Sequence, residues 1–204
     1  TKIYGNADTT FAYTVEAAGT NRGLVGSDTF TGALARAAGE NVGTYAINQG
    51  TLNNGNYAIT YVADSYAITQ RPITLTATSA TKIYSNTDPS IAVTLTSGSL
   101  ASVAVTDTLA DVTGTITRSA GENVGNYNIL LGSGAQASNY AITYNATNQA
   151  FAITQRPITI TADANQTKIY GNSDATFTYA VEAVGTNRGL VGCDTFTGAL
   201  ARTA

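Results

Sequence analysis

The sequence predicts an all-β protein built from tandem units, and three observations support this class. Apolar and polar residues alternate in short segments such as 73–77, which is typical of strands with one buried face. These segments are rich in threonine, valine, isoleucine and tyrosine and are bounded by glycine, asparagine, aspartate and serine. The same segments also return along the chain at long intervals, which indicates repeated units.

The repeats define the expected domains. Thr-Lys-Ile-Tyr begins at residues 1, 81 and 167, so its copies are 80 and 86 residues apart. Ile-Thr-Gln-Arg-Pro-Ile-Thr begins at residues 68 and 153. One complete unit therefore runs from 71 to 155. Residues 1–70 form a unit that lacks its first strand, and residues 156–204 form the first half of a third unit.

Six or seven short strands are expected in each complete unit. The clearest are 11–15, 29–34, 45–48, 57–62, 65–69, 73–77, 91–95 and 158–162. The three prolines lie at strand starts or in an Asp-Pro turn, where a missing N–H does no harm. The best helical candidate, 100–109, is rich in valine and threonine and predicts at most one helical turn.

A two-layer, immunoglobulin-like β-sandwich accommodates this number of short strands, each with one apolar face. A β-grasp-like unit, with one helix on a mixed sheet, is the alternative. The junction Gln70-Arg71-Pro72 joins consecutive units without a flexible linker, and proline restricts both its own φ and the residue before it. The units are therefore expected to form a semi-rigid rod.

The sequence Ala-Gly-Glu-Asn-Val-Gly-x-Tyr occurs at 38–45 and 120–127, each time two residues after an arginine. It predicts a structural turn that leads into a strand, with the arginine and glutamate satisfying the turn by an ion pair or by hydrogen bonds. A ligand-binding ion pair is the alternative. The predicted turn residues are Arg36, Gly39, Glu40, Gly43 and Tyr45 in the first copy, and Arg118, Gly121, Glu122, Gly125 and Tyr127 in the second.

Composition argues against several classes of function. Only 11% of residues are charged and the net charge is -3, whereas a nucleic-acid partner calls for a basic face. The chain has no histidine and a single cysteine, so we expect no catalytic residues, no resident metal, no cofactor and no intrachain disulfide. It also lacks an apolar run of eighteen residues, so no membrane insertion of this segment is expected.

Taken together, five motifs resemble the MBG/YDG-type tandem repeat of bacterial filamentous-haemagglutinin-like surface adhesins. They are Lys-x-Tyr-Gly-Asn, Asp-x-x-x-Gly-x-Leu-x-Arg, the Ala-Gly-Glu-Asn-Val-Gly-x-Tyr turn, Asn-Tyr-Ala-Ile-Thr and the Gln-Arg-Pro junction. The resemblance covers the whole chain and implies a non-enzymatic stalk or adhesion role at the bacterial cell surface or in a secreted fibre. One departure is Ser85, which stands where the other copies have Gly5 and Gly171.

Two further sites are weaker hypotheses. Lys82, Glu122 and Asn139 supply the residue types of an isopeptide bond, in which a carboxylate relays a proton between lysine and asparagine. Calcium needs clustered oxygen ligands, and the acidic residues here are dispersed along the sequence.

The sequence leads to two hypotheses of function. In the first, the units are structural stalk repeats of a surface adhesin or fibre and act mechanically in adhesion or biofilm cohesion. In the second, the units bind host or biofilm glycans or mucin-like ligands directly. The expected partners are neighbouring repeats or other copies in a fibre. Because 156–204 lacks the later strands of a unit, we expect a neighbour to complete it.

Overall fold

A computed structural model describes residues 1–146 and 150–203, and these residues form mostly β structure in several small mixed sheets. The all-β class is confirmed to this extent. The strands are β1 (Lys2–Ile3), β2 (Ala35–Arg36), β3 (Gly43–Asn48), β4 (Asp64–Thr69), β5 (Arg71–Ala77), β6 (Ala80–Ile83), β7 (Val93–Gly98), β8 (Thr117–Arg118), β9 (Gly125–Tyr127), β10 (Ile129–Leu130), β11 (Tyr140–Asn145), β12 (Phe151–Thr154), β13 (Ile160–Ala162) and β14 (Tyr179–Val181).

Helical structure is confined to two short segments of the described chain. The helix α1 (Leu109–Thr113) is a single turn, and η1 (Ala137–Asn139) is a turn of 3-10 helix. Thr108 caps α1 by accepting a hydrogen bond from the Asp111 amide, while Asp111 accepts one from the Thr108 amide. The single helical turn expected near 100–109 therefore begins at the last residue of that segment.

The chain divides into two compact units that do not follow the sequence copies. Unit 1 contains residues Thr1–Ala77, Val93–Thr117 and Leu131–Asn145. Unit 2 contains Thr78–Ala92, Arg118–Leu130 and Ala146–Ala204. Each unit thus combines segments of two consecutive sequence copies.

Unit 1 contains a four-stranded sheet of order β1-β4-β3-β2 and a three-stranded sheet of order β11-β5-β7. In the first sheet, β4 pairs in parallel with β1 and antiparallel with β3. In the second, β5 pairs in parallel with β11 and antiparallel with β7. Both β4 and β5 therefore have a neighbour on each side.

One hydrophobic core unites these two sheets. It takes buried side chains from both copies: Tyr4, Tyr66 and Ile68 from the first, and Ile73, Leu75, Ala101, Val112 and Tyr140 from the second. The rings of Tyr4 and Tyr140 meet edge to face with centroids 5.5 Å apart. The two sequence copies thus share a single core within unit 1.

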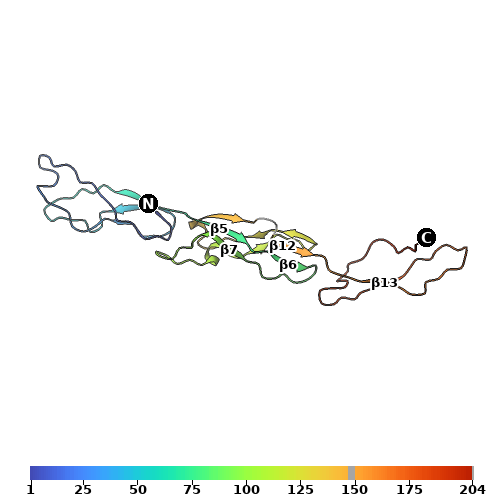
Figure 1. The fold of residues 1–204 in the computed structure, drawn as a ribbon. Helices are drawn as coiled ribbons and strands as arrows, with labels where there is room; N and C mark the ends of the chain where they lie inside the picture. The colour runs from blue at the N-terminus through green and yellow to red at the C-terminus, as the bar shows by residue number, and fades with distance from the viewer. Residues whose placement is uncertain (147–149, 204) are drawn as a thin grey trace. The chain divides into compact units, whose positions relative to one another are not determined.

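Unit 2 is built on the same plan, and Figure 1 shows β12 beside β6. β12 pairs in parallel with β6 and antiparallel with β9, as β4 does with β1 and β3. Even the register agrees, because Lys82 lies opposite Ile153 as Lys2 lies opposite Ile68. β13 pairs antiparallel with β14, as β5 does with β7.

The parallel pairs join strands that are distant in sequence. The local alternation of apolar and polar residues does not predict which strands pair in this way. Immunoglobulin-like sheets are antiparallel, whereas a mixed sheet is a feature of the β-grasp alternative. In the described chain, only the two short turns α1 and η1, both in the second copy, could lie against such a sheet.

Ser85 adopts the backbone conformation of the glycines that it replaces. Its φ is 67°, close to the 79° of Gly5 and the 86° of Gly171. A residue with a Cβ is strained in this left-handed region, so the turn keeps its shape at a cost in the middle copy.

We therefore expect Ser85→Gly to stabilise unit 2 by about 1 kcal/mol, by removing this strain. The reverse change, Gly5→Ser, is the matched control in unit 1. It should be destabilising, because a Cβ at Gly5 would lie 2.3 Å from the Ala101 Cβ. Thermal unfolding followed by circular dichroism measures both; equal effects of the two variants would contradict the assignment of strain to Ser85.

A second prediction follows from the core that the two copies share. Leu75→Ala removes a fully buried side chain of the second copy and should destabilise unit 1 by about 2–5 kcal/mol. Amide hydrogen exchange should then accelerate in β3 and β4 of the first copy as well as in β5 and β11, while β12 keeps its protection. The exposed Val62→Ala is the control. Loss of protection confined to the second copy would show that the copies fold separately.

Candidate functional site

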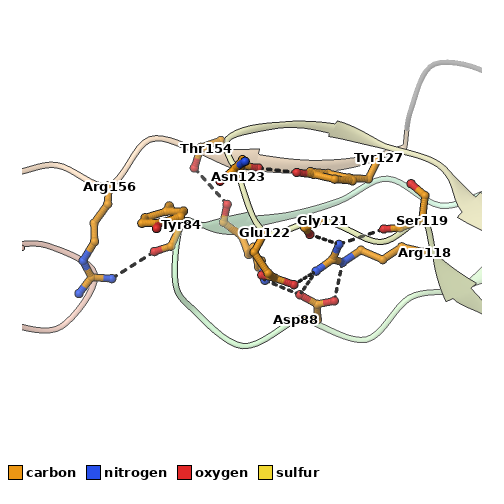
Figure 2. A network of polar contacts seen from close by, with 11 residues as sticks. Tyr84, Asp88, Arg118, Ser119, Gly121, Glu122, Asn123, Tyr127, Thr154 and Arg156 are labelled. Atoms are coloured by element: carbon orange, nitrogen blue, oxygen red, sulfur yellow. Dashed lines mark hydrogen bonds and ion pairs between the residues drawn. The ribbon is translucent and has the colours of Figure 1, made fainter. Parts of the chain in front are cut away.

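The most distinctive side-chain cluster in the chain is built around the second Gly-Glu-Asn-Val-Gly turn. It contains Lys82, Asp88, Arg118 and Glu122, and we call it the ion-pair cluster. Figure 2 shows Arg118 between Asp88 and Glu122, with its guanidinium turned toward the turn backbone. β6 supplies Lys82, β8 supplies Arg118, and the turn before β9 supplies Glu122. Strand pairing of β6 and β9 with β12 brings these elements together.

Every charge in the cluster faces an opposite charge. Lys82 Nζ lies 2.6 Å from an Asp88 oxygen and also contacts Glu122. Arg118 Nε lies 2.6 Å from the other Asp88 oxygen, and its terminal nitrogen contacts Glu122. The Lys82 and Arg118 side chains are only 4% and 8% exposed. Buried cations need such partners, because an unpaired charge out of water is costly.

Arg118 also holds the turn backbone directly. Its guanidinium donates to the carbonyl oxygens of Ser119, at 3.1 Å, and Gly121, at 2.5 Å. The Tyr127 hydroxyl donates to the Asn123 carbonyl at 2.6 Å, and the Arg118 guanidinium lies over the Tyr127 ring, 5.2 Å from its centroid. Carbonyl groups that the turn leaves without strand partners are thereby satisfied.

The first copy carries the same cluster in unit 1. Lys2 lies 2.7 Å from Asp8 and 2.5 Å from Glu40. Arg36 lies 2.8 Å from Asp8 and 2.5 Å from Glu40. Tyr45 again donates to a turn carbonyl, that of Asn41, at 2.7 Å. The third copy has the matching Lys168–Asp174 and Arg202–Asp174 pairs, at 2.7 Å and 2.8 Å.

The glycines of the turn have different roles. Gly39 and Gly121 have φ values of 136° and 137°, and a Cβ there would lie 2.4 Å and 2.5 Å from the tyrosine ring of the same copy. These positions therefore require glycine, because the tyrosine ring leaves no room for a side chain there. Gly43 and Gly125 instead open strands β3 and β9.

The structure thus gathers the predicted turn residues in both copies around a single structural feature. The predictions included arginine and glutamate, but not the shared aspartate. The sequence does contain a pattern that points to this aspartate: an aspartate follows the lysine by six residues in all three copies, at Asp8, Asp88 and Asp174.

The isopeptide residues have separate sets of partners. Lys82 and Glu122 belong to the ion-pair cluster of unit 2. Asn139 is 3% exposed in unit 1, where its side-chain oxygen accepts from the Val42 amide at 2.9 Å. Its amide nitrogen donates to Asn41 at 3.0 Å and to Gln136 at 2.7 Å. Asn139 therefore joins the second copy to the turn of the first copy.

A second inter-copy contact lies at the junction arginines, which we call the arginine clamp. Arg71 Nε donates to the Ser99 carbonyl at 3.0 Å, and a terminal nitrogen donates to Asn6 of the first copy at 3.2 Å. Arg156 likewise donates to Asn86 at 3.1 Å and to the Gly189 carbonyl at 3.0 Å. Each clamp holds the copy before the junction to the copy after it, within one unit.

Charge pairing sets the protonation of the cluster. Hydrogen bonds from Arg118 and then Lys82 lower the pKa of Asp88 to about 2, and Lys82 and Arg118 lower the pKa of Glu122. Burial alone would lower the pKa of Lys82, but its bonds to Asp88 and Glu122 outweigh burial and raise it. All four groups are therefore charged near neutral pH, which suits a structural clasp rather than proton transfer.

Metal and membrane sites are not apparent in the described part of the chain. Within residues 1–146 and 150–203, no group of three histidine, cysteine, aspartate or glutamate side chains could hold a metal ion. Over the same residues, no helix is long and apolar enough to cross a membrane.

The depressed pKa of Asp88 predicts acid sensitivity. Because the folded pKa lies below the ordinary value of 3.8, ionised Asp88 stabilises unit 2 above about pH 4, and this stabilisation is lost as pH falls toward 2. Asp88→Asn should lower the stability of unit 2 at neutral pH and flatten its pH dependence between these values. Denaturant unfolding at a series of pH values measures this. Asp163→Asn, an exposed aspartate outside the cluster, is the control, and an identical response of both variants would refute the prediction.

One protein-family model matches three segments that together cover most of the chain. The family model described as MBG domain (YGX type) matches residues 1–70, 73–150 and 158–204. Comparison with curated proteins and with solved structures finds no significant match. Since the three matches together span most of the sequence, the chain belongs to the MBG domain family (YGX type), of which it carries three tandem copies.

Proposed function

We propose that these repeats form a mechanical stalk of a bacterial cell-surface adhesin or extracellular fibre, in which two-layer β units are joined as a semi-rigid rod. MBG domain repeats are typical of bacterial surface proteins, which gives the proposal its setting. In this role, the repeats project a distal adhesive region or link cells in a biofilm. No enzymatic step is part of the proposal.

The observation that carries the proposal is the sharing of one core by two consecutive copies. β4 of the first copy and β5 of the second are separated by Gln70 alone, and side chains from both copies fill the core of unit 1. A hinge at this junction would have to open that core. A junction without a free hinge resists bending, which is what a stalk needs in order to hold a distal region away from the cell.

The arginine clamp supports the same conclusion. At Gln70 and Arg71, side-chain hydrogen bonds reach Ser138, Ser99 and Asn6 in both adjoining copies. Arg156 makes the corresponding bonds in unit 2, including one to the Tyr84 carbonyl that Figure 2 shows. The junction is thus held by polar bonds as well as by apolar packing.

Small-angle X-ray scattering of the full chain tests the stalk directly. We expect an extended particle whose scattering fits one conformation, because the junctions do not hinge freely. Inserting a short Gly-Ser linker between Gln70 and Arg71 should broaden the ensemble, since it separates β4 from β5. The same insertion between Gly26 and Ser27, in an exposed loop, is the matched control. A compact or freely flexible wild-type chain would contradict the proposal.

Direct ligand binding remains the competing function, and a glycan array separates the two. The stalk function predicts no specific glycan signal from the wild-type chain. A specific signal that survives unfolding controls would replace the mechanical function with direct recognition.

A further inference from the structure

The three copies carry two lengths of one turn. In each copy, an aspartate amide closes the turn by donating to the carbonyl oxygen of an earlier residue. That residue lies three positions upstream in the first and third copies, but six positions upstream in the second. The donor and acceptor pairs are Asp28–Val25, at 3.1 Å, Asp194–Val191, at 3.2 Å, and Asp107–Ala101, at 3.0 Å. We call the first two the short turns and the third the long turn.

Tyrosine contacts show that the short and long turns occupy equivalent places in their copies. In the first copy, the Tyr57 hydroxyl donates to the aspartate of the turn at 2.6 Å and accepts from the Val25 amide at 2.9 Å. In the second copy, the Tyr140 hydroxyl makes the same two bonds with the aspartate and the Ala101 amide, at 2.7 Å and 2.9 Å. The three additional residues of the long turn are therefore an insertion between two matched ends.

The long turn packs on Gly5 of the preceding copy, within unit 1. Its Ala104 amide donates to the Gly5 carbonyl at 3.1 Å, and Ala101 at its start is fully buried. Gly5 has a φ of 79°, and a Cβ added there would lie 2.3 Å from the Ala101 Cβ and 3.0 Å from the Ala101 Cα. Because the Cα belongs to the main chain, no change of rotamer could relieve this contact. A copy that precedes a long turn therefore requires glycine at this position.

The second copy has a serine at this position, and a copy with a short turn follows it. Ser85 keeps the left-handed backbone of Gly5, with a φ of 67°. The short turn of the third copy lies beside the preceding residue in unit 2, since the Tyr84 hydroxyl donates to Asp194 at 3.4 Å, but Ser85 is exposed. The short turn thus leaves room for a side chain that the long turn would exclude.

We propose that the residue at this position selects the turn length of the copy that follows. A copy with Ser85 combines only with a following copy that has the short turn, whereas a copy with Gly5 accepts the long turn. The order of the three copies agrees with this rule, because 167–204 repeats 1–38 with seven substitutions and the copy with the long turn stands between them. The inference concerns how copies combine within the chain, and it stands independently of the stalk function.

A steric rule of this kind has a clear use in a chain of similar copies. Each unit is assembled from segments of two copies, so equivalent segments of different copies can compete for one place. Apolar packing discriminates poorly between them, since 71–77 and 156–162 differ only in Leu75 and Ile160. A clash between a Cβ and the main chain excludes the wrong copy without changing the contacts of the right one. One side chain can therefore decide which copies combine.

Exchange of the turns in the full chain tests the inference in unit 2. Replacing 191–194 by the sequence of 101–107 places a long turn after Ser85 and should lower the folding equilibrium constant of unit 2 at least about tenfold. Ser85→Gly should recover that loss, in addition to the gain that the same substitution gives with the short turn. Protection of β6 and β12 in native-state amide exchange measures the stability of unit 2. An identical effect of Ser85→Gly with either turn would overturn the inference.

Unit 1 provides the reciprocal test, with amide exchange of β4 and β5 as the measurement. Gly5→Ser should cost at least about tenfold more with the long turn than after replacement of 101–107 by the sequence of 25–28. Ala101→Gly keeps the long turn, removes the Cβ in contact and should also reduce the cost. Val103→Ala, at a 71% exposed position of the same turn, is the control and should leave the cost unchanged. An equal cost of Gly5→Ser in every background would refute the rule.

Discussion

The structure depends on the passage of the chain from β4 to β5 across a single residue, Gln70. Each strand is flanked on both edges, β4 by β1 and β3 and β5 by β7 and β11. A hinge at Gln70 would have to open the core that the two sheets share and break the hydrogen bonds of Arg71 with Asn6 and of Asn139 with Asn41. The proline after Arg71 adds stiffness, because it fixes its own φ. The shared core, the arginine clamp and the offset of the units from the sequence copies all follow from this passage.

The ion-pair cluster holds the Gly-Glu-Asn-Val-Gly turn against the strands beside it. Lysine and arginine are buried beside strands β4 or β12, and two carboxylates neutralise them from the solvent side. Removing one partner would leave a cation with little access to water, so the loss of a carboxylate from the cluster is costly. In unit 1, Asn139 then binds the same turn from the next copy, so the turn both completes one sheet and connects two copies. The lysine, arginine and aspartate recur in all three copies, but the cations are buried only in the first two; Lys168 and Arg202 of the third copy are 37% and 56% exposed.

The environment of a side chain in this offset construction depends on the neighbouring copy. When a unit is assembled from two consecutive copies, each copy necessarily presents groups that its neighbour completes. Exposure of Ile160 and burial of Leu75, in otherwise identical segments, show how much of the environment of a side chain comes from the neighbouring copy.

The sequence by itself determined the β class, the repeat spacing, the turn residues such as Gly39 and Tyr45, and the short junction at Arg71. These features follow from local alternation, glycine and proline geometry, and repetition, all of which can be read along the chain. Only the tertiary structure decided that β4 pairs in parallel with β1, that Asp88 joins Lys82 and Arg118, and that Asn139 belongs to the turn of the preceding copy rather than to Lys82. The parallel pairing of Lys2 with Ile68, the ion pair of Arg118 with Asp88 and the hydrogen bond of Asn139 with Val42 all join residues that are distant in sequence. Local patterns of alternation and turn chemistry carry no information on which distant partner is chosen.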